Sequence, residues 1–190
     1  LQKISKTRKT QKKNRTNIFR VSLVGYTNAG KSTVMRAVSQ KSAYVKDELF
    51  ATLDTSTRRI NIDKINSFIL SDTVGFIRNL PDNLIASFRS TLGELSDSNL
   101  LLKIIDISSL EYEMHLDSIN SVLNYLGIGS KDYIIIFNKI DLLKDKILIE
   151  KLKILYPEAL FVSAYKNLNI YDLNETIKAR ISKNNIKQKI

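Results

Sequence analysis

Short apolar runs alternate with longer amphipathic stretches from about residue 18 to residue 182. Five of the runs have the length of buried strands, and a sixth alternates polar with apolar residues, as a strand with one wet face does. The predicted strands are residues 19–24, 59–63, 67–70, 100–105, 133–137 and 160–162. The predicted helices are residues 31–38, 82–95, 110–126, 143–155 and 168–182.

This order of elements predicts an α/β fold with a six-stranded, mostly parallel sheet, one antiparallel edge strand, and helices on both faces. Sheets of this kind bind their ligands at the carboxyl ends of the strands. Polar motifs that directly follow a predicted strand are therefore the first candidates for a functional site.

Composition narrows the class of protein. The chain has 190 residues, 43% of them hydrophobic, which suits one well-cored domain. It has no cysteine, which excludes disulfides and thiolate metal sites and is compatible with a reducing compartment. Apolar runs such as residues 134–137 are far too short to span a bilayer, and no secretion signal is evident.

The net charge of +11 resides at the two ends of the chain. Residues 1–15 hold seven Lys or Arg and residues 178–190 hold five, without an acidic residue in either segment. We expect residues 1–16 to be a basic helical connector from a preceding domain, residues 17–182 to form the main domain, and residues 183–190 to be a basic tail. Such ends suit contact with RNA or an acidic membrane surface, or they are simply solvated.

The segment "GYTNAGKST" has the pattern of a phosphate-binding loop between a strand and a helix. Gly25 and Gly30 allow the backbone to turn tightly and approach a diphosphate. Lys31 is expected to reach the β- and γ-phosphates, and the Ser32 hydroxyl to ligate Mg²⁺. The loop alone leaves ATPases, kinases and GTPases as alternatives.

The segment "NKID" follows the strand at residues 133–137 and selects guanine. The Asp141 carboxylate can accept hydrogen bonds from the ring N–H and the exocyclic amine of guanine, whereas adenine would leave it unpaired. Asn138 is expected to brace the loop and contact the base, and the stem of Lys139 to cover the face of the base.

Two further segments suit the metal and the γ-phosphate. In "SDTVGF", Asp72 is placed to hold Mg²⁺ through a water, and the Gly75 backbone N–H to sense the γ-phosphate. The hydroxyl-rich residues 49–58 suit a switch loop, in which Thr52 is the predicted metal ligand and Thr55 the alternative.

Three single residues complete the interpretation. In "VSAY", the Ala164 N–H is expected against guanine O6. Phe76 stands where many small GTPases have a glutamine that orients water, which predicts slow intrinsic turnover that a partner stimulates. His115 lies in an amphipathic stretch without a partner motif, so we expect a surface histidine without a role.

Together these motifs resemble the G domain of P-loop GTPases related to translation factors, and among them the HflX family. The resemblance rests on "LVGYTNAGKST", "LFATLD", "DTVGFIRNLP", "SFRSTL", "LLLKIID", "FNKIDLL" and "FVSA", and it covers about residues 1–180. The family usually has proline at the position of Thr55 and lysine at the position of Tyr165. Its N-terminal domain is not expected in this chain.

The resemblance implies a Mg²⁺-dependent GTPase that binds GTP and GDP, associates with the large ribosomal subunit, and takes part in splitting stalled ribosomes. It also implies a monomer in the cytoplasm or an organellar matrix, with no integral membrane segment and at most peripheral membrane association. The alternatives are a guanine-nucleotide sensor with negligible hydrolysis, and an RNA- or membrane-binding module.

The predicted functional residues fall into three sets. The catalytic groups are Lys31 and Gly75, and the metal ligands are Ser32, Thr52 and Asp72. The nucleotide-binding residues are Gly25, Tyr26, Thr27, Asn28, Ala29, Gly30, Lys31, Ser32, Thr33, Phe50, Ala51, Thr52, Leu53, Asp54, Asp72, Thr73, Val74, Gly75, Asn138, Lys139, Ile140, Asp141, Ser163, Ala164 and Tyr165.

Overall fold

A computed structural model describes residues 18–40, 45–46, 57–61, 67–72 and 95–187 of the chain. Its strands are β1 (Phe19–Gly25), β2 (Val45–Lys46), β3 (Thr57–Asn61), β4 (Ser67–Asp72), β5 (Leu100–Asp106), β6 (Tyr133–Asn138) and β7 (Leu160–Phe161). Its helices are α2 (Lys31–Gln40), α4 (Tyr112–Tyr125), the 3₁₀-helix η1 (Ile140–Leu142), α5 (Ile147–Leu155) and α6 (Ile170–Lys187).

The strands form one sheet in the order β2-β3-β4-β1-β5-β6-β7. Strands β4, β1, β5, β6 and β7 are parallel, and β3 pairs antiparallel with β4. The six predicted strands and the single antiparallel direction are thus confirmed. The two-residue β2, which the sequence did not predict, lies outside β3, so the antiparallel strand is next to the edge of the sheet.

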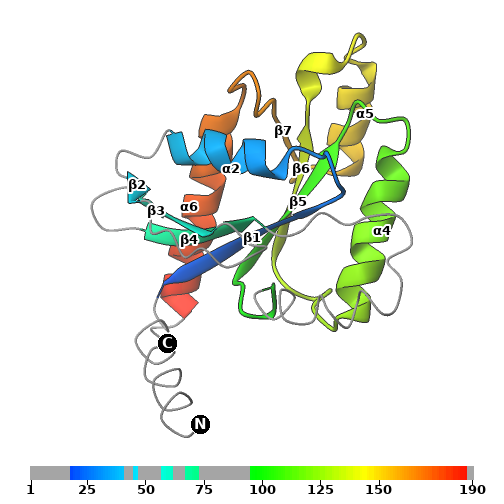
Figure 1. Ribbon diagram of the computed structural model, residues 1–190. Coiled ribbons are helices and arrows are strands. Elements are labelled where there is room, and N and C mark those ends of the chain that lie inside the picture. The colour runs from blue at the N-terminus through cyan, green and yellow to red at the C-terminus, as the bar shows by residue number, and fades with distance from the viewer. Residues whose placement is uncertain (1–17, 41–44, 47–56, 62–66, 73–94, 188–190) are drawn as a thin grey trace, which may run out of the picture.

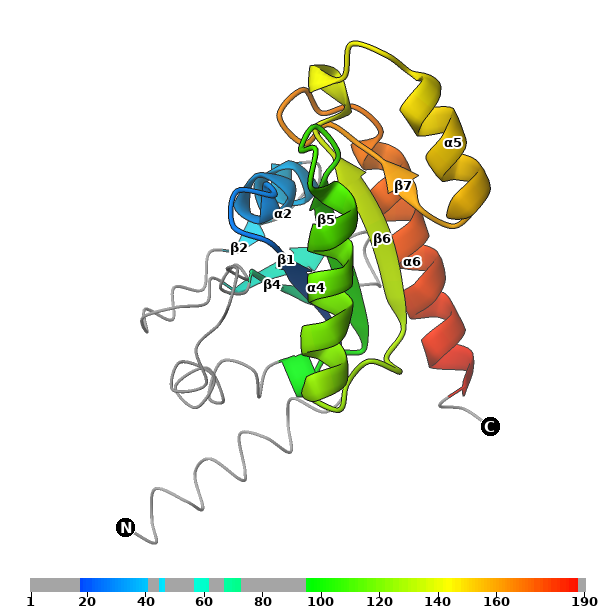
Figure 2. The same cartoon turned by 90° about the vertical axis from the view of Figure 1, so that its right-hand side faces the viewer.

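Helices cover both faces of the sheet, as Figures 1 and 2 show. On one face α2 and α6 pack against the sheet through residues such as Val34 and Leu173. On the other face α4 and α5 contribute Ile119 and Leu152 to a second core. None of the helices in the described ranges is both long and apolar enough to cross a bilayer.

Some predicted boundaries differ from the observed ones. Helix α5 begins at Ile147, where the Asp145 side chain accepts a hydrogen bond from the Ile147 N–H, and the preceding turn is the separate η1. Helix α6 continues to Lys187, so the expected boundary at residue 182 lies inside it. Of the helix predicted at residues 82–95, only the last residue is described, and residues 1–17 lie outside the described ranges.

The parallel strands bring distant motifs to one edge of the sheet. Gly25, Asp72, Asp106 and Asn138 are the last residues of β1, β4, β5 and β6, and Asp106 is paired in register with Asn138. Figure 1 shows the connections that follow β1, β5 and β6 on the same side of the sheet. The predicted phosphate, metal and base motifs therefore meet at this edge.

Candidate nucleotide-binding site

The turn between β1 and α2 has the backbone conformation that its glycines permit. Gly30 has a φ of +92°, and a Cβ at this position would lie 2.4 Å from Nδ2 of Asn138. A Cβ at Gly25 would lie 2.5 Å from the carbonyl oxygen of Ile104 on β5. Glycine is therefore required at Gly30 by its left-handed φ and by the neighbouring Asn138, and at Gly25 by the close approach of β5.

Two residues of the loop interior lie on opposite sides of its backbone. Asn28 is exposed and has a left-handed φ of 62°, whereas the Ala29 side chain is buried against the core. The Ala29 N–H donates to Tyr26 O over 3.2 Å and closes the turn. Thr27 is exposed and Thr33 is half-buried in the first turn of α2. The loop thus presents polar side chains to solvent.

Lys31 is folded back across this loop. Its side chain donates to the carbonyl oxygens of Gly25 and Tyr26 over 3.2 and 3.1 Å, and the residue is only 7% exposed. Burial lowers the pKa of Lys31 below its ordinary value, and the negative charge of Asp72 partly opposes this change. A phosphate group at the loop would give this buried ammonium the opposite charge that two carbonyls do not supply.

Ser32 and Asp72 meet at the predicted metal site. The Ser32 hydroxyl donates to Oδ2 of Asp72 over 2.5 Å, while Oδ1 of Asp72 is buried and has no hydrogen-bond partner among the described residues. A hydroxyl and one carboxylate are the protein ligands expected for Mg²⁺ that also binds substrate phosphates. These two residues therefore fit a magnesium ion, and the third predicted ligand, Thr52, lies outside the described residues.

Asn138 connects three segments of the site. Its Nδ2 donates to the Ala29 carbonyl over 2.9 Å, and its Oδ1 accepts a hydrogen bond from the Ala164 N–H over 3.1 Å. The Asn138 side chain is buried, so these bonds are protected from water. This geometry agrees with the expected role of Asn138 in bracing the loop. The Ala164 N–H, which we expected to contact guanine O6, donates to Oδ1 of Asn138 in this structure.

The rest of the "NKID" segment forms a tight turn after β6. Lys139 has a left-handed φ of 67° and pairs with Oδ2 of Asp106 over 2.6 Å. The Ile140 N–H donates to Val162 O over 3.3 Å, which ties the turn to the segment after β7. Oδ1 of Asp141 is buried, and no residue in the described part of the chain forms a hydrogen bond with it. A buried acceptor of this kind suits the hydrogen-bond donors of guanine.

The "VSAY" segment follows β7 and borders the same turn. Ser163 is fully buried and exchanges two backbone hydrogen bonds with Leu168, and its hydroxyl accepts from the Lys166 N–H. Tyr165 is 77% exposed, and the Lys166 ammonium lies 5.2 Å from the centre of its ring. Lys166 therefore lies beside Tyr165, the position at which the family usually has lysine.

Several predicted residues lie outside the described ranges, and the predictions for them stay untested. They include the switch-loop residues and the γ-phosphate sensor with its neighbours: Phe50, Ala51, Thr52, Leu53, Asp54, Thr55, Thr73, Val74, Gly75 and Phe76.

The structure corrects the interpretation of His115. Its ring stacks on Tyr26 of the phosphate loop, with the ring centres 4.1 Å apart and the planes 17° apart, and its side chain is only 13% exposed. No local sequence pattern indicates this contact, because it joins α4 to a loop 89 residues earlier. Asp106 was also missed as a site residue, although its position at a strand end beside Asn138 is a usable signal.

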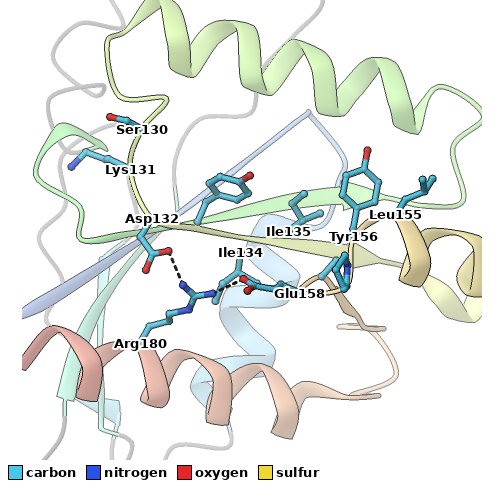
Figure 3. A pocket seen from close by; sticks show the side chains of 12 residues that line it. Ser130, Lys131, Asp132, Ile134, Ile135, Leu155, Tyr156, Glu158 and Arg180 are labelled. Carbon is cyan, nitrogen blue, oxygen red and sulfur yellow. Dashed lines mark hydrogen bonds and ion pairs between the residues drawn. The ribbon is translucent and has the colours of Figure 1, made fainter.

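A cavity of about 510 Å³ lies at the opposite end of β6. Figure 3 shows Arg180 of α6 at its wall, paired with Asp132 and Glu158 over 2.9 and 3.0 Å. Tyr133, the first residue of β6, lines the cavity. Asn138, the last residue of β6, lies at the other end of the strand, where the predicted phosphate, metal and base motifs meet. This cavity is therefore separate from the nucleotide site.

The chain is similar to known GTP-binding proteins. Residues 20–139 match the family model described as 50S ribosome-binding GTPase. A crystal structure of a GTP-binding protein from Sulfolobus solfataricus in complex with GDP superposes with a TM-score of 0.70 at 28% identity, over 96% of this chain and 58% of that chain.

Curated relatives narrow the family further. A GTPase HflX of Flavobacterium psychrophilum is 49% identical over 141 residues, which are 74% of this chain and 34% of the relative. A GTPase HflX of Escherichia coli is 36% identical over 185 residues, which are 96% of this chain and 43% of the relative. The chain thus spans less than half the length of these relatives. It belongs to the 50S ribosome-binding GTPase family and, within that family, to the HflX GTPases.

Proposed function

We propose that this chain binds guanine nucleotide with Mg²⁺ and hydrolyses GTP to GDP and phosphate. One observation carries the proposal. Among the described residues, two buried side-chain oxygens lack a hydrogen-bond partner, Oδ1 of Asp72 and Oδ1 of Asp141. They belong to the carboxylates that the motifs assign to the metal and to the base. Since a buried carboxylate oxygen without a partner is costly, both oxygens favour a ligand.

Lys31 and the loop backbone act on the phosphates in this proposal. Lys31 exchanges its two carbonyl acceptors for phosphate oxygens, and Ser32 and Asp72 hold the metal together with Thr52. Bound Mg²⁺ supplies positive charge against the β- and γ-phosphate oxygens. The Gly75 N–H senses the γ-phosphate. Because Phe76 cannot orient water by a hydrogen bond, intrinsic turnover is slow and a partner raises it.

The proposed partner is the large ribosomal subunit. The family description and the HflX relatives support this proposal, and a basic segment at residues 1–16 supplies charge suited to ribosomal RNA. In this proposal the protein works as a monomer in the cytoplasm or an organellar matrix, with residues 1–16 as a connector to a preceding domain.

Base preference gives the first test. The wild-type chain is expected to bind GDP and not ADP in isothermal titration calorimetry. Asp141→Asn replaces an acceptor by an amide, so GDP affinity should fall, whereas xanthosine diphosphate, which offers a carbonyl in place of the exocyclic amine, should bind better. Asp117→Asn, the same substitution on an exposed face of α4, is the control and should leave both affinities unchanged. Preference for ADP in the wild type would overturn the proposal.

Turnover gives the second test and separates the switch from its alternatives. Single-turnover GTP hydrolysis is measured with and without large ribosomal subunits, and the subunits are expected to accelerate it. Binding without hydrolysis in both conditions would favour a nucleotide sensor. Binding to RNA or to acidic vesicles that falls steeply with salt and does not depend on nucleotide would favour a module that acts through its basic ends.

A further inference from the structure

Asp106 at the end of β5 has every carboxylate oxygen occupied by the chain itself. Oδ2 contacts the Lys139 ammonium over 2.6 Å. Oδ1 accepts hydrogen bonds from the Ser108 N–H over 3.0 Å and from the Ser108 hydroxyl over 2.5 Å. Asp141, on the same turn as Lys139, instead has a buried oxygen without a hydrogen-bond partner within the described ranges. The two carboxylates near the proposed base site therefore differ. Both oxygens of Asp106 have partners, whereas Asp141 has one oxygen without a partner among the described residues.

The backbone holds Asp106 and Lys139 at a fixed distance. Asp106 lies beside Asn138 in the parallel register of β5 and β6, and the Ile107 N–H donates to Asn138 O over 3.0 Å. The Lys139 side chain is 29% exposed and the Asp106 side chain 17%, so water screens the pair only in part. The carboxylate is thus anchored before it meets the lysine, and Ser108 fixes its orientation.

Lys139 needs such a support on two counts. Its φ of 67° is a left-handed conformation that residues other than glycine seldom adopt. Its long side chain has many rotamers, and ordering that side chain on ligand binding costs entropy. An ion pair already formed in the free protein fixes the far end of the side chain, so that the aliphatic stem is held in one conformation.

We propose that Asp106 is a positioning residue for the purine base, holding the stem of Lys139 over the face of the base through their ion pair. This inference rests on the proposed guanine site at residues 138–141. The stem contacts a ring face, which all purines share, whereas Asp141 reads the edge of the base. Asp106 therefore raises affinity for every purine nucleotide that the site accepts and leaves the choice among them to Asp141.

Asp106→Asn tests the proposal because it keeps the shape of the side chain and removes its charge. Dissociation constants for GDP and inosine diphosphate are measured by isothermal titration calorimetry at constant salt. Both should rise by the same factor, roughly three- to tenfold for a charge-assisted bond, with the ratio between them unchanged. Ser108→Ala, which removes one bond that orients the carboxylate, should shift both constants in the same direction by a smaller factor.

Asp132→Asn is the matched control. It breaks an ion pair of similar length, with Arg180, at the opposite end of β6, and it should leave both dissociation constants unchanged. Urea unfolding of each variant shows that the variants are folded at the temperature of the titration. Equal losses of GDP affinity in Asp132→Asn and Asp106→Asn would overturn the proposal, because the effect would then be a general loss of stability.

A double-mutant cycle separates positioning from a structural role. In a Lys139→Ala background, Asp106→Asn should change the dissociation constants no further, since the stem it positions is gone. An undiminished effect in that background, or wild-type affinity in Asp106→Asn alone, would overturn the inference. If wild-type protein fails to prefer GDP over ADP, the proposed function fails first; if it prefers GDP and Asp106→Asn binds as well, only this inference fails.

Discussion

The side-chain amide of Asn138 donates a hydrogen bond to the Ala29 carbonyl over 2.9 Å, across 109 residues of sequence. Its oxygen accepts from the Ala164 N–H over 3.1 Å. One buried side chain therefore joins the phosphate loop, the end of β6 and the segment after β7. The segments proposed to bind phosphate and base are therefore linked through this amide.

Asn138→Ala is expected to weaken both the fold and nucleotide binding. The substitution leaves a buried carbonyl and a buried N–H without partners, which should lower the free energy of unfolding by roughly 1–3 kcal/mol. Urea unfolding and titration with GDP measure the two effects. Asn185→Ala on the exposed side of α6 is the control, and an equal loss of stability there would contradict the coupling.

Gly30→Ala is expected to disrupt the site more than the strain of its backbone explains. A Cβ at Gly30 would lie 2.4 Å from the Asn138 amide, whereas a Cβ at Gly127, which also has a left-handed φ, meets nothing within 4 Å. Gly127→Ala therefore measures only the cost of placing a side chain on a residue with a left-handed φ. We expect Gly30→Ala to lose GDP binding in calorimetry and Gly127→Ala to retain it. Retained binding in both variants would show that the loop tolerates the methyl group.

Tyr26 and His115 are expected to stabilise the phosphate loop as a pair. Their rings stack with centres 4.1 Å apart, which fixes the start of the loop against α4. Replacing either residue by alanine should lower the free energy of unfolding and reduce GDP affinity. A double-mutant cycle should give a coupling of about 0.5–1.5 kcal/mol. Additive losses in the double variant would mean that the stack contributes nothing of its own.

Lys103 on β5 makes stability depend on pH. It is 5% exposed, donates to Oδ1 of Asn120 over 2.7 Å, and lies 3.6 Å from the centre of the Tyr133 ring. Burial lowers the pKa of Lys103 in the folded state, so above that lowered pKa the unfolded chain binds more protons than the folded one. Stability should therefore rise with pH up to the ordinary lysine pKa of about 10.4.

Lys103→Met should flatten this rise. The variant removes the buried ammonium and keeps a chain of similar length, so its unfolding free energy should exceed that of the wild type most clearly at neutral pH. Chemical denaturation between pH 7 and about pH 10 measures both curves, a range that ends near the ordinary lysine pKa. Since Lys31 also has a lowered pKa and is present in both proteins, it affects both curves equally. Parallel curves would refute the assignment to Lys103.

The architecture and most of the residues at the strand ends could be predicted from the amino-acid sequence alone. Buried parallel strands need continuous apolar runs, and these runs appear in the sequence because each strand is covered on both faces. The strands at Tyr133–Asn138 and Leu100–Asp106 were predicted to within one residue for this reason. The glycines, the lysine and "NKID" were recognisable because each follows such a run at a fixed spacing.

Which of these groups are already paired became visible in the folded protein. Asp106 is saturated by Lys139 and Ser108, Asp72 and Asp141 each keep an oxygen open, and His115 lies against Tyr26. Local spacing encodes strands and turns, because it fixes which side chains lie on one face. Contacts between strand ends and between a loop and a helix depend on strand order and helix packing, which no local spacing encodes.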